Sequence, residues 1–337
     1  MDDPNISEQE LWPPKKASRI HQAWAAMKTA LEGNTGLLLV AASQAFFSLM
    51  NVSVKTLNSI DPPVSALQLI FVRMSITWFC CTGYMIAAKV PNPILGPKGV
   101  RLLLVFRGFT GFISLFGIYY SLQYLSLSDA TVLTFLAPLC TAVAGAVLLG
   151  EKFSLKQAAA AVISLIGVVL IARPASLFGG LDEGSPLEVL LPEVDGILTA
   201  KHVALIGVLG ATGAYTTLTA IGKRAHPLHA LTSFSVQSVI ATSVAMLVTK
   251  QPIVIPARAE WLAMFVMIGI FGFFAQILLT MGLQRESASR GSMAIYTQIV
   301  FATIFERVFF NVVPTILSGI GTLLIVASAI YVAVSSD

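Results

Sequence analysis

Residues 130–149 read ATVLTFLAPLCTAVAGAVLL, twenty consecutive residues without a charged side chain. An α-helix that crosses the hydrocarbon core of a bilayer needs about 20 mostly apolar residues. The run ends at Gly150-Glu151-Lys152, where charged residues return. This segment therefore predicts a membrane-spanning helix.

The composition of the 337 residues extends this prediction to the whole chain. Apolar residues make up 56% and charged residues 11%, against about 25% charged in a typical globular domain, and the mean hydropathy is +0.82. Too few charges remain to cover a water-facing surface, which excludes soluble enzymes and nucleic-acid-binding domains. The composition predicts a polytopic membrane protein.

Ten segments have the length and polarity of membrane spans. They are residues 36–57, 64–88, 102–125, 130–149, 155–172, 203–222, 228–249, 261–283, 291–313 and 315–334. The apolar runs are continuous, whereas the strands of a β-barrel would alternate apolar and polar residues. The predicted fold class is therefore all-α, with ten transmembrane helices.

The charges of the connecting segments predict the orientation. If the N-terminus is cytoplasmic, thirteen Lys and Arg residues lie inside: Lys15, Lys16, Arg19, Lys28, Lys89, Lys98, Arg101, Lys152, Lys156, Lys223, Arg224, Arg285 and Arg290. Four lie outside: Arg173, Lys201, Lys250 and Arg258. Cytoplasmic loops carry the excess of Lys and Arg, so both termini are expected in the cytoplasm.

Composition divides the chain into five parts. These are a cytoplasmic tail (1–34), a first five-helix repeat (35–173), an acidic, Gly- and Pro-rich non-cytoplasmic linker (174–201), a second five-helix repeat (202–334) and a cytoplasmic C-terminus (335–337). In the tail, Ile20, Trp24, Met27 and Leu31 recur at helical spacing near basic residues. This pattern indicates an amphipathic helix on the inner leaflet, with a disordered tail as the alternative.

A shift of 161 residues relates the two halves. It places Leu122-Gln123 on Leu283-Gln284, Ser126 on Ser287 and Ser128 on Ser289. Identity between the halves is otherwise low, so the shift predicts a repeat of architecture, with five spans in each half.

No enzyme signature is present. The sequence has no HExxH, no GxSxG and no Walker A loop, and His226 and His229 supply two metal ligands without a third. We therefore predict no catalytic residue, no cofactor and no metal.

Charges inside the spans point to a binding function. The cations are Lys55, Arg73, Arg107 and Arg307, and Glu306 is the only acid within the predicted spans. One carboxylate cannot neutralise four cations, so the surplus must face a wet cavity, bond to backbone carbonyls or meet an anionic ligand. Structural bonding and an anion-favouring pathway are equally weighted alternatives.

Uncharged polar residues extend this set, because polar side chains in a membrane tend to face the protein interior. Bonding between helices explains many of them equally well, and Pro138 breaks the backbone ladder of its helix. The substrate-pathway candidates are Gln44, Asn51, Arg73, Arg107, Tyr119, Tyr120, Gln123, Thr134, Pro138, Tyr215, Gln276, Tyr296, Gln298 and Glu306.

Four features of the first half form a recognisable pattern: residues 121–130, Pro138, Gly150-Glu151-Lys152-Phe153 and residues 167–171. With this pattern the chain resembles the EamA domain of the drug/metabolite transporter superfamily. Residues 119–131 and Arg173-Pro174 resemble the G branch of solute carrier family 35. The second half departs from this pattern, because Ile299 and Val312 stand 161 residues beyond Pro138 and Glu151.

This resemblance implies two inverted five-helix repeats around a central cavity and alternating access. The predicted function is secondary transport of a small polar metabolite, with an organic anion favoured. The alternative is a non-transporting membrane partner or regulatory protein with the same fold. Expected partners are the small-molecule substrate and the lipid bilayer, with no nucleic acid. The oligomeric state stays open, with a homodimer among the alternatives.

Overall fold

The computed structural model describes residues 33–58, 64–121, 125, 127–152, 154–174, 177, 193–250, 253 and 259–334. The amphipathic helix predicted in the tail lies outside these residues. The chain divides into two units, Met1–Thr35 and Gly36–Asp337, and the helical fold belongs to the second.

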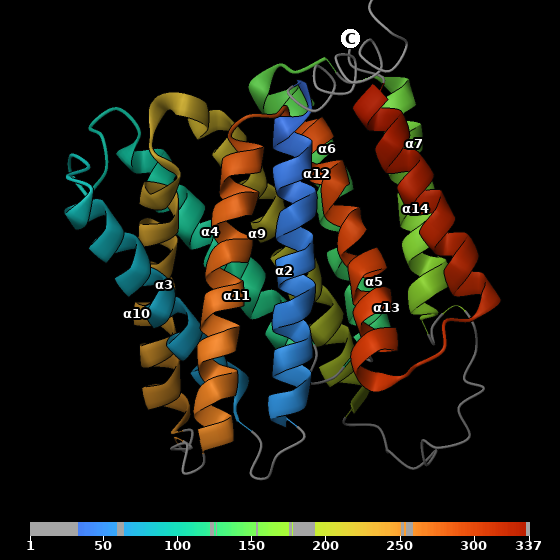
Figure 1. The fold of residues 1–337 in the computed structure, drawn as a ribbon, viewed down its shortest axis with the longest axis horizontal. Helices are drawn as coiled ribbons and strands as arrows, with labels where there is room; N and C mark the ends of the chain where they lie inside the picture. The colour runs from blue at the N-terminus through green and yellow to red at the C-terminus, as the bar shows by residue number, and fades with distance from the viewer. Residues whose placement is uncertain are drawn as a thin grey trace, which may run out of the picture. The chain divides into compact units, whose positions relative to one another are not determined.

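The described residues form long helices that run alongside one another (Figure 1). They are α2 (Thr35–Asn58), α3 (Ala66–Ala87), α4 (Arg101–Ser121), α5 (Leu127–Thr134), α6 (Leu136–Leu149), α7 (Leu155–Ala172), α9 (Glu193–Ile221), η2 (Gly222–Arg224), α10 (Pro227–Thr249), α11 (Ala259–Leu283), α12 (Ala288–Met293), η3 (Ala294–Tyr296), α13 (Thr297–Phe310) and α14 (Ile316–Val334). Within the described ranges, ten segments are long and apolar enough to cross a membrane, which confirms the predicted fold class.

The 161-residue shift reappears in the helix boundaries. Helices α5, α6 and α7 begin at residues 127, 136 and 155, and α12, α13 and α14 begin at 288, 297 and 316. Gly150 and Asn311, also 161 apart, both end their helices in the left-handed conformation, with φ of 66° and 54°. The local backbone therefore follows the repeat even where the residue types differ.

Two spans are interrupted, which the sequence anticipated only in part. The fourth span breaks at Phe135, between α5 and α6, and Pro138 lies in the first turn of α6. Proline is tolerated there because the first N–H groups of a helix lack an intrahelical partner. The ninth span breaks at η3 without a proline. Thr297 Oγ1 donates to the Ala294 carbonyl (2.7 Å), and such side-chain bonds compete with regular helical bonding.

The helix that contains the sixth span begins before the span does. The predicted span, 203–222, agrees within two residues at each end with the apolar segment Lys201–Arg224, whereas α9 begins at Glu193 and takes in residues assigned to the linker.

Glycines allow helices of the two repeats to approach closely. A Cβ built on Gly207 of α9 would lie 3.0 Å from the Cα of Gly117 on α4. A Cβ built on Gly167 of α7 would lie 2.7 Å from the carbonyl oxygen of Gly321 on α14. Small residues at helix crossings are typical of packing in membranes, where van der Waals contact drives association.

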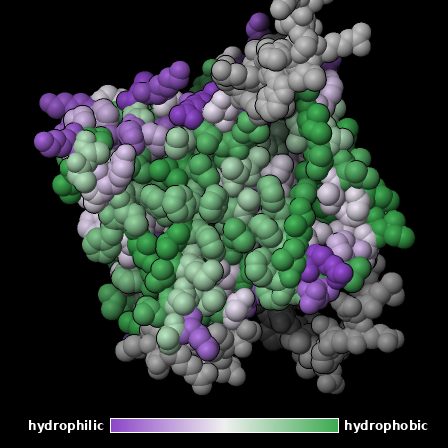
Figure 2. All heavy atoms as spheres, viewed as in Figure 1, coloured by the Kyte–Doolittle hydropathy of each residue, from purple (hydrophilic) through white to green (hydrophobic). Residues whose placement is uncertain are grey.

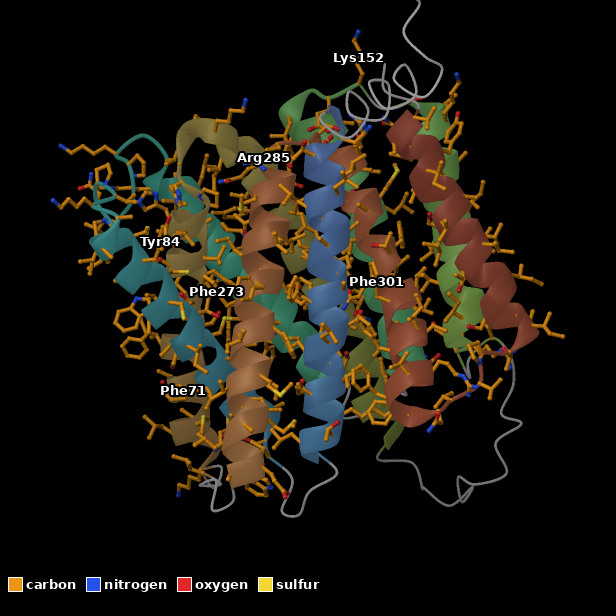
Figure 3. All side chains as sticks on the ribbon, in the orientation of Figure 1. Phe71, Tyr84, Lys152, Phe273, Arg285 and Phe301 are labelled. Atoms are coloured by element: carbon orange, nitrogen blue, oxygen red, sulfur yellow. The ribbon has the colours of Figure 1, made fainter. Side chains whose placement is uncertain are left out.

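The two ends of the bundle differ in charge. Lys152 and Arg285 mark the end at which α2 begins (Figure 3), and we call this the basic end. Other basic residues lie in the connections that follow α3, α6, α9 and α11 or near the ends of the helices they join: Lys89, Lys98, Arg101, Lys156, Lys223, Arg224 and Arg290. On the visible face, hydrophobic side chains cover the middle and hydrophilic ones gather toward the ends (Figure 2). This pattern matches a protein surrounded by lipid.

Candidate functional site

The interruptions of the fourth and ninth spans meet inside the bundle. The Phe135 ring stacks on the Tyr296 ring with centroids 5.8 Å apart and planes 21° apart. Ser292 Oγ donates to the Pro138 carbonyl at 3.1 Å, so α12 is also bonded to α6. Tyr296 is fully buried, and its hydroxyl has no hydrogen-bond partner among the described residues. The predicted residues Pro138 and Tyr296 therefore lie at one junction between the repeats.

Arg107 and Tyr215 lie near this junction. Tyr215 on α9 packs against a buried cluster formed by Ala137 of α6 with Val208 and Ala211 of α9. It also interacts electrostatically with the Arg107 guanidinium on α4. That guanidinium lies over the Phe234 ring of α10, 4.6 Å from its centroid. Arg107 is only 3% exposed, so it does not extend to water as a snorkelling cation would.

A narrow cavity lies between α4, α5 and α9. Its volume is ≈ 10 Å³, and its lining residues are Ser114, Ile118, Ser121, Thr134, Ala204, Gly207, Val208 and Ala211. This volume suits about one water molecule. The predicted residue Thr134 contributes to the lining, while its hydroxyl donates to the Ala130 carbonyl.

A second polar group joins α2 to α13. Ser48 Oγ donates to the backbone carbonyl of the predicted residue Gln298 at 3.0 Å. Gln44 is buried, and its amide bonds within its own helix, to Ser43 Oγ and the Val40 carbonyl. The predicted residue Asn51 is exposed.

Arg73 and Gln276 lie between α3 and α11. Both are buried, and the Arg73 side chain packs against Gly272, one helical turn from Gln276. The side-chain amide oxygen of Gln276, Oε1, has no hydrogen-bond partner among the described residues.

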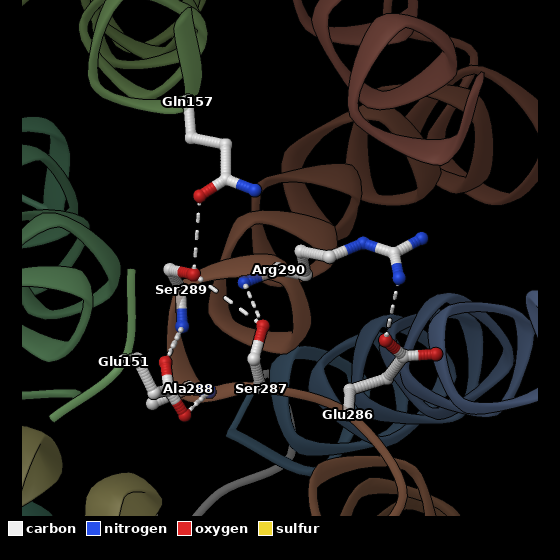
Figure 4. Close-up of polar contacts among 7 residues, drawn as sticks. All are labelled: Glu151, Gln157, Glu286, Ser287, Ala288, Ser289 and Arg290. Carbon is white, nitrogen blue, oxygen red and sulfur yellow. Dashed lines mark hydrogen bonds and ion pairs between the residues drawn. The ribbon is translucent and has the colours of Figure 1, made fainter. Parts of the chain in front are cut away.

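A polar network at the basic end joins residues that were not among the site residues predicted from the sequence (Figure 4). The Glu151 carboxylate accepts hydrogen bonds from the backbone N–H groups of Ala288 (2.7 Å) and Ser289 (3.3 Å) at the start of α12. Ser289 Oγ also lies 3.3 Å from Gln157 Oε1. This network joins the first repeat to the second. In the sequence, Gly150-Glu151-Lys152 marked the end of an apolar run and gave no indication of the partner of Glu151.

Glu286 adds a second contact at this end. Its Oε2 lies 3.4 Å from Arg290 Nη1, and both side chains are largely buried. Burial raises the pKa of the Glu286 carboxyl, while Arg290 and the Leu37 backbone N–H act in the opposite direction.

Glu306 lies at the opposite end, where it reaches a cation on another helix. Its carboxylate is 3.5 Å from Lys55 Nζ, with both side chains about half exposed, and Lys55 also lies over the Phe310 ring. Glu306 lines a cavity of ≈ 160 Å³ with Ile171, Arg173, Thr303, Val312, Val313, Pro314, Thr315 and Ser318.

The structure thus brings the predicted residues into several groups rather than one site. Pro138, Tyr215 and Tyr296 lie around the junction of α6, α9 and η3. Arg107 adjoins this group through its interaction with Tyr215, and Thr134 lines the narrow cavity. Arg73 and Gln276 lie between α3 and α11. Gln44 lies on α2, Gln298 at the contact of α2 with α13, and Glu306 at the end opposite the basic end. Tyr120 stacks on Phe116, and the Tyr119 side chain and Gln123 lie outside the described residues. Within the described ranges, no group of three His, Cys, Asp or Glu residues could hold a metal ion.

Comparison with known proteins adds a family match. The model described as the EamA-like transporter family matches residues 34–173 and 202–334. A probable transport protein of Saccharomyces cerevisiae is 40% identical over 90% of this chain and 90% of its own length. Human solute carrier family 35 member G1 is 31% identical over 92% of this chain and 81% of its own length.

Two more distant similarities also cover most of this chain. The pseudopaline exporter CntI of Pseudomonas aeruginosa is 27% identical over 88% of this chain and 95% of its own length. A solved crystal structure with 19% identity covers 89% of this chain and 96% of its own, with a TM-score of 0.68. The latter is a similarity of fold.

Proposed function

The chain belongs to the EamA-like transporter family, and we propose that it is a secondary transporter of a small polar metabolite, with organic anions favoured. Transport proceeds by alternating access, and the basic end faces the cytoplasm. The chain is an integral, multi-pass membrane protein. Its relatives include a probable transport protein and an exporter.

The paired helix interruptions carry this proposal. Phe135 and Tyr296 lie where each repeat breaks a span, and their rings are in contact. Broken helices near the middle of a membrane are the usual place for substrate sites, because their backbone groups can turn toward a ligand. The polar residues Thr134 and Ser292 flank the two breaks, so the junction combines backbone and hydroxyl groups.

The preference for anions follows from the buried cation Arg107, which is 3% exposed. The ion pairs found among the described residues join Lys55 to Glu306 and Arg290 to Glu286, and neither involves Arg107. A pathway with buried positive charge attracts anions and repels cations.

The alternative is a membrane partner or regulator that transports nothing. Such a protein needs no buried polar groups without partners, whereas Gln276, Thr280 and Tyr296 each bury one such atom among the described residues. Buried polar groups without partners are costly unless water or a ligand satisfies them. We therefore favour transport, and the absence of an enzyme signature favours it over catalysis.

The test combines binding with flux. Purified protein in detergent is screened for metabolites that raise its apparent melting temperature, because a ligand that binds the folded state stabilises it by mass action. Stabilising metabolites are then measured for counterflow into proteoliposomes. Saturable uptake supports transport. Stabilisation without uptake of any metabolite, in protein that is folded and correctly inserted, would favour the regulatory alternative.

A further inference from the structure

Arg107 is a buried cation that no carboxylate balances in the described part of the chain. Its side chain is 3% exposed, and its Nε and Nη1 atoms have no hydrogen-bond partner there. These two atoms carry three N–H donors. A buried charge is unfavourable unless it is paired and hydrogen-bonded. The residue therefore has a positive charge and unused donors in the same place.

The surroundings of Arg107 hold the guanidinium in one position. Its carbon lies 4.6 Å from the centroid of the Phe234 ring, a favourable cation–π arrangement. Nη1 occupies the space that a Cβ at Gly111 would take. The side chain therefore runs one turn along α4, toward Ser114 and away from the basic end.

Along α4, the lining of the narrow cavity begins at Ser114, about two helical turns beyond Arg107. Its lining residues Ser114, Ile118 and Ser121 follow Arg107 at spacings of 7, 11 and 14 residues, so they share its face of α4. On α9, the lining residue Ala211 stands one turn from Tyr215, which interacts with Arg107. The same two helix faces thus form the cavity and lead to the buried charge.

We propose that Arg107 binds the carboxylate of the transported substrate, with the Tyr215 hydroxyl beside it and the Phe234 ring behind it. This rests on the proposed transport function and assigns it a substrate class, organic monocarboxylates. The carboxylate oxygens accept hydrogen bonds from Nε and Nη1 and neutralise the guanidinium. One guanidinium balances one negative charge, so a phosphate dianion would bring an unbalanced charge into the bundle. The substrate reaches Arg107 when the helices around the narrow cavity separate.

The test uses monocarboxylates of increasing chain length, their matched primary amides and inorganic phosphate. Apparent melting temperature is measured in detergent for the wild type, Arg107→Met, Gly111→Ala and Arg101→Met. The methionine variant keeps a long side chain but removes the unbalanced charge, so its ligand-free melting temperature should equal or exceed that of the wild type. Gly111→Ala keeps the charge but displaces Nη1. Arg101→Met is the matched control, because it removes an arginine from the first turn of the same helix.

We expect carboxylates, but not their amides, to stabilise the wild type and Arg101→Met. Arg107→Met should lose this effect, and Gly111→Ala should need at least tenfold more carboxylate. A methionine variant that melts lower while carboxylates still stabilise it would make Arg107 a structural residue and overturn the proposal. Equal stabilisation by the amides, or stronger stabilisation by phosphate, would also overturn it.

Flux measurements separate this proposal from the transport function on which it rests. Carboxylate uptake that Arg107→Met abolishes and Arg101→Met retains supports both. Uptake of neutral or cationic metabolites that is equal in the wild type and Arg107→Met would leave transport standing and overturn the carboxylate site. No uptake of any metabolite by folded, inserted protein would overturn the transport function itself.

Discussion

Phe135 and Tyr296 stand 161 residues apart, at equivalent positions of the two repeats, and stack on each other with ring centroids 5.8 Å apart. Phe135 lies between α5 and α6, and Tyr296 is the last residue of η3, directly before α13. The two interruptions therefore contact each other directly, and the contact is made by equivalent residues of the two repeats.

Substitutions of Tyr296 should separate the role of its ring from that of its hydroxyl. Tyr296→Phe keeps the stack and removes a buried hydroxyl without a partner among the described residues, so stability should stay equal or rise. Tyr296→Ala removes the ring and should lower the free energy of unfolding by about 3–5 kcal/mol. Thermal or denaturant unfolding in detergent measures both. Equal losses in the two variants would contradict a structural role for the stack.

Glu151 should stabilise the start of α12 through its two backbone hydrogen bonds. Glu151→Gln removes the negative charge from the helix N-terminus and should lower the free energy of unfolding by about 0.5–2 kcal/mol. Amide hydrogen exchange at residues 288 and 289 should become faster. The neighbouring exposed Lys152→Gln serves as the control and should change neither quantity. Unchanged exchange in Glu151→Gln would show that the carboxylate does not hold this helix.

Glu286 should make stability depend on pH. Burial raises the pKa of its carboxyl above the ordinary 4.5, so the folded protein binds this proton more tightly than the unfolded chain. Stability is therefore highest when Glu286 is protonated and falls as the pH rises from 4.5 through the pKa of the folded state. Glu286→Gln should flatten the melting temperature over this range. The exposed Glu260→Gln controls for net charge, and an equal flattening in both variants would assign the effect elsewhere.

Glu306 and Lys55 should contribute little to stability, because half-exposed ion pairs are worth about 0–1 kcal/mol. If Glu306 couples transport to protons, Glu306→Gln should abolish gradient-driven accumulation and leave substrate exchange intact. Lys55→Gln is the matched control, because it breaks the same ion pair and keeps the acid. Loss of accumulation in both variants would assign the effect to the ion pair, and retained accumulation in Glu306→Gln would exclude proton coupling there.

The proposed orientation predicts the sidedness of three positions. A cysteine at Gly184 should react with a membrane-impermeant reagent from outside, and cysteines at Lys223 or Asp337 only from the cytoplasmic side. The variants are made after replacing Cys80, Cys81 and Cys140. Reaction at 184 and 223 from the same side would contradict the ten-span arrangement.

Hydropathy was sufficient to predict the spans but not their interruptions. Apolar length alone identifies a segment such as α11, because the bilayer imposes that length on any spanning helix. The break at Phe135 was indicated by Pro138, whereas the break at η3 lacks a proline and depends on hydroxyl bonds made in the folded backbone. The start of α9 was missed because its first residues are polar, and hydropathy does not register a helix beyond the membrane.

The sequence was sufficient to select polar residues of the candidate site, but not to predict which of them lie next to each other. Arg107 and Tyr215 were both selected from the sequence as polar residues in apolar spans, yet their proximity follows from the crossing of α4 and α9. Phe234 was missed, since a phenylalanine in an apolar span gives no signal of a cation above it. Glu151 likewise needed the fold, because its partners stand more than a hundred residues away. The pathway role of these residues stays a prediction.

The glycine contacts between α4 and α9 and between α7 and α14 bear on biogenesis. Each pair takes one helix from each repeat, and the backbones approach too closely for water or lipid to enter between them. During synthesis, the faces of Gly117 and Gly167 have no partner until α9 and α14 emerge from the ribosome. The first five helices therefore enter the membrane as an unfinished half, and their folding is completed by the second.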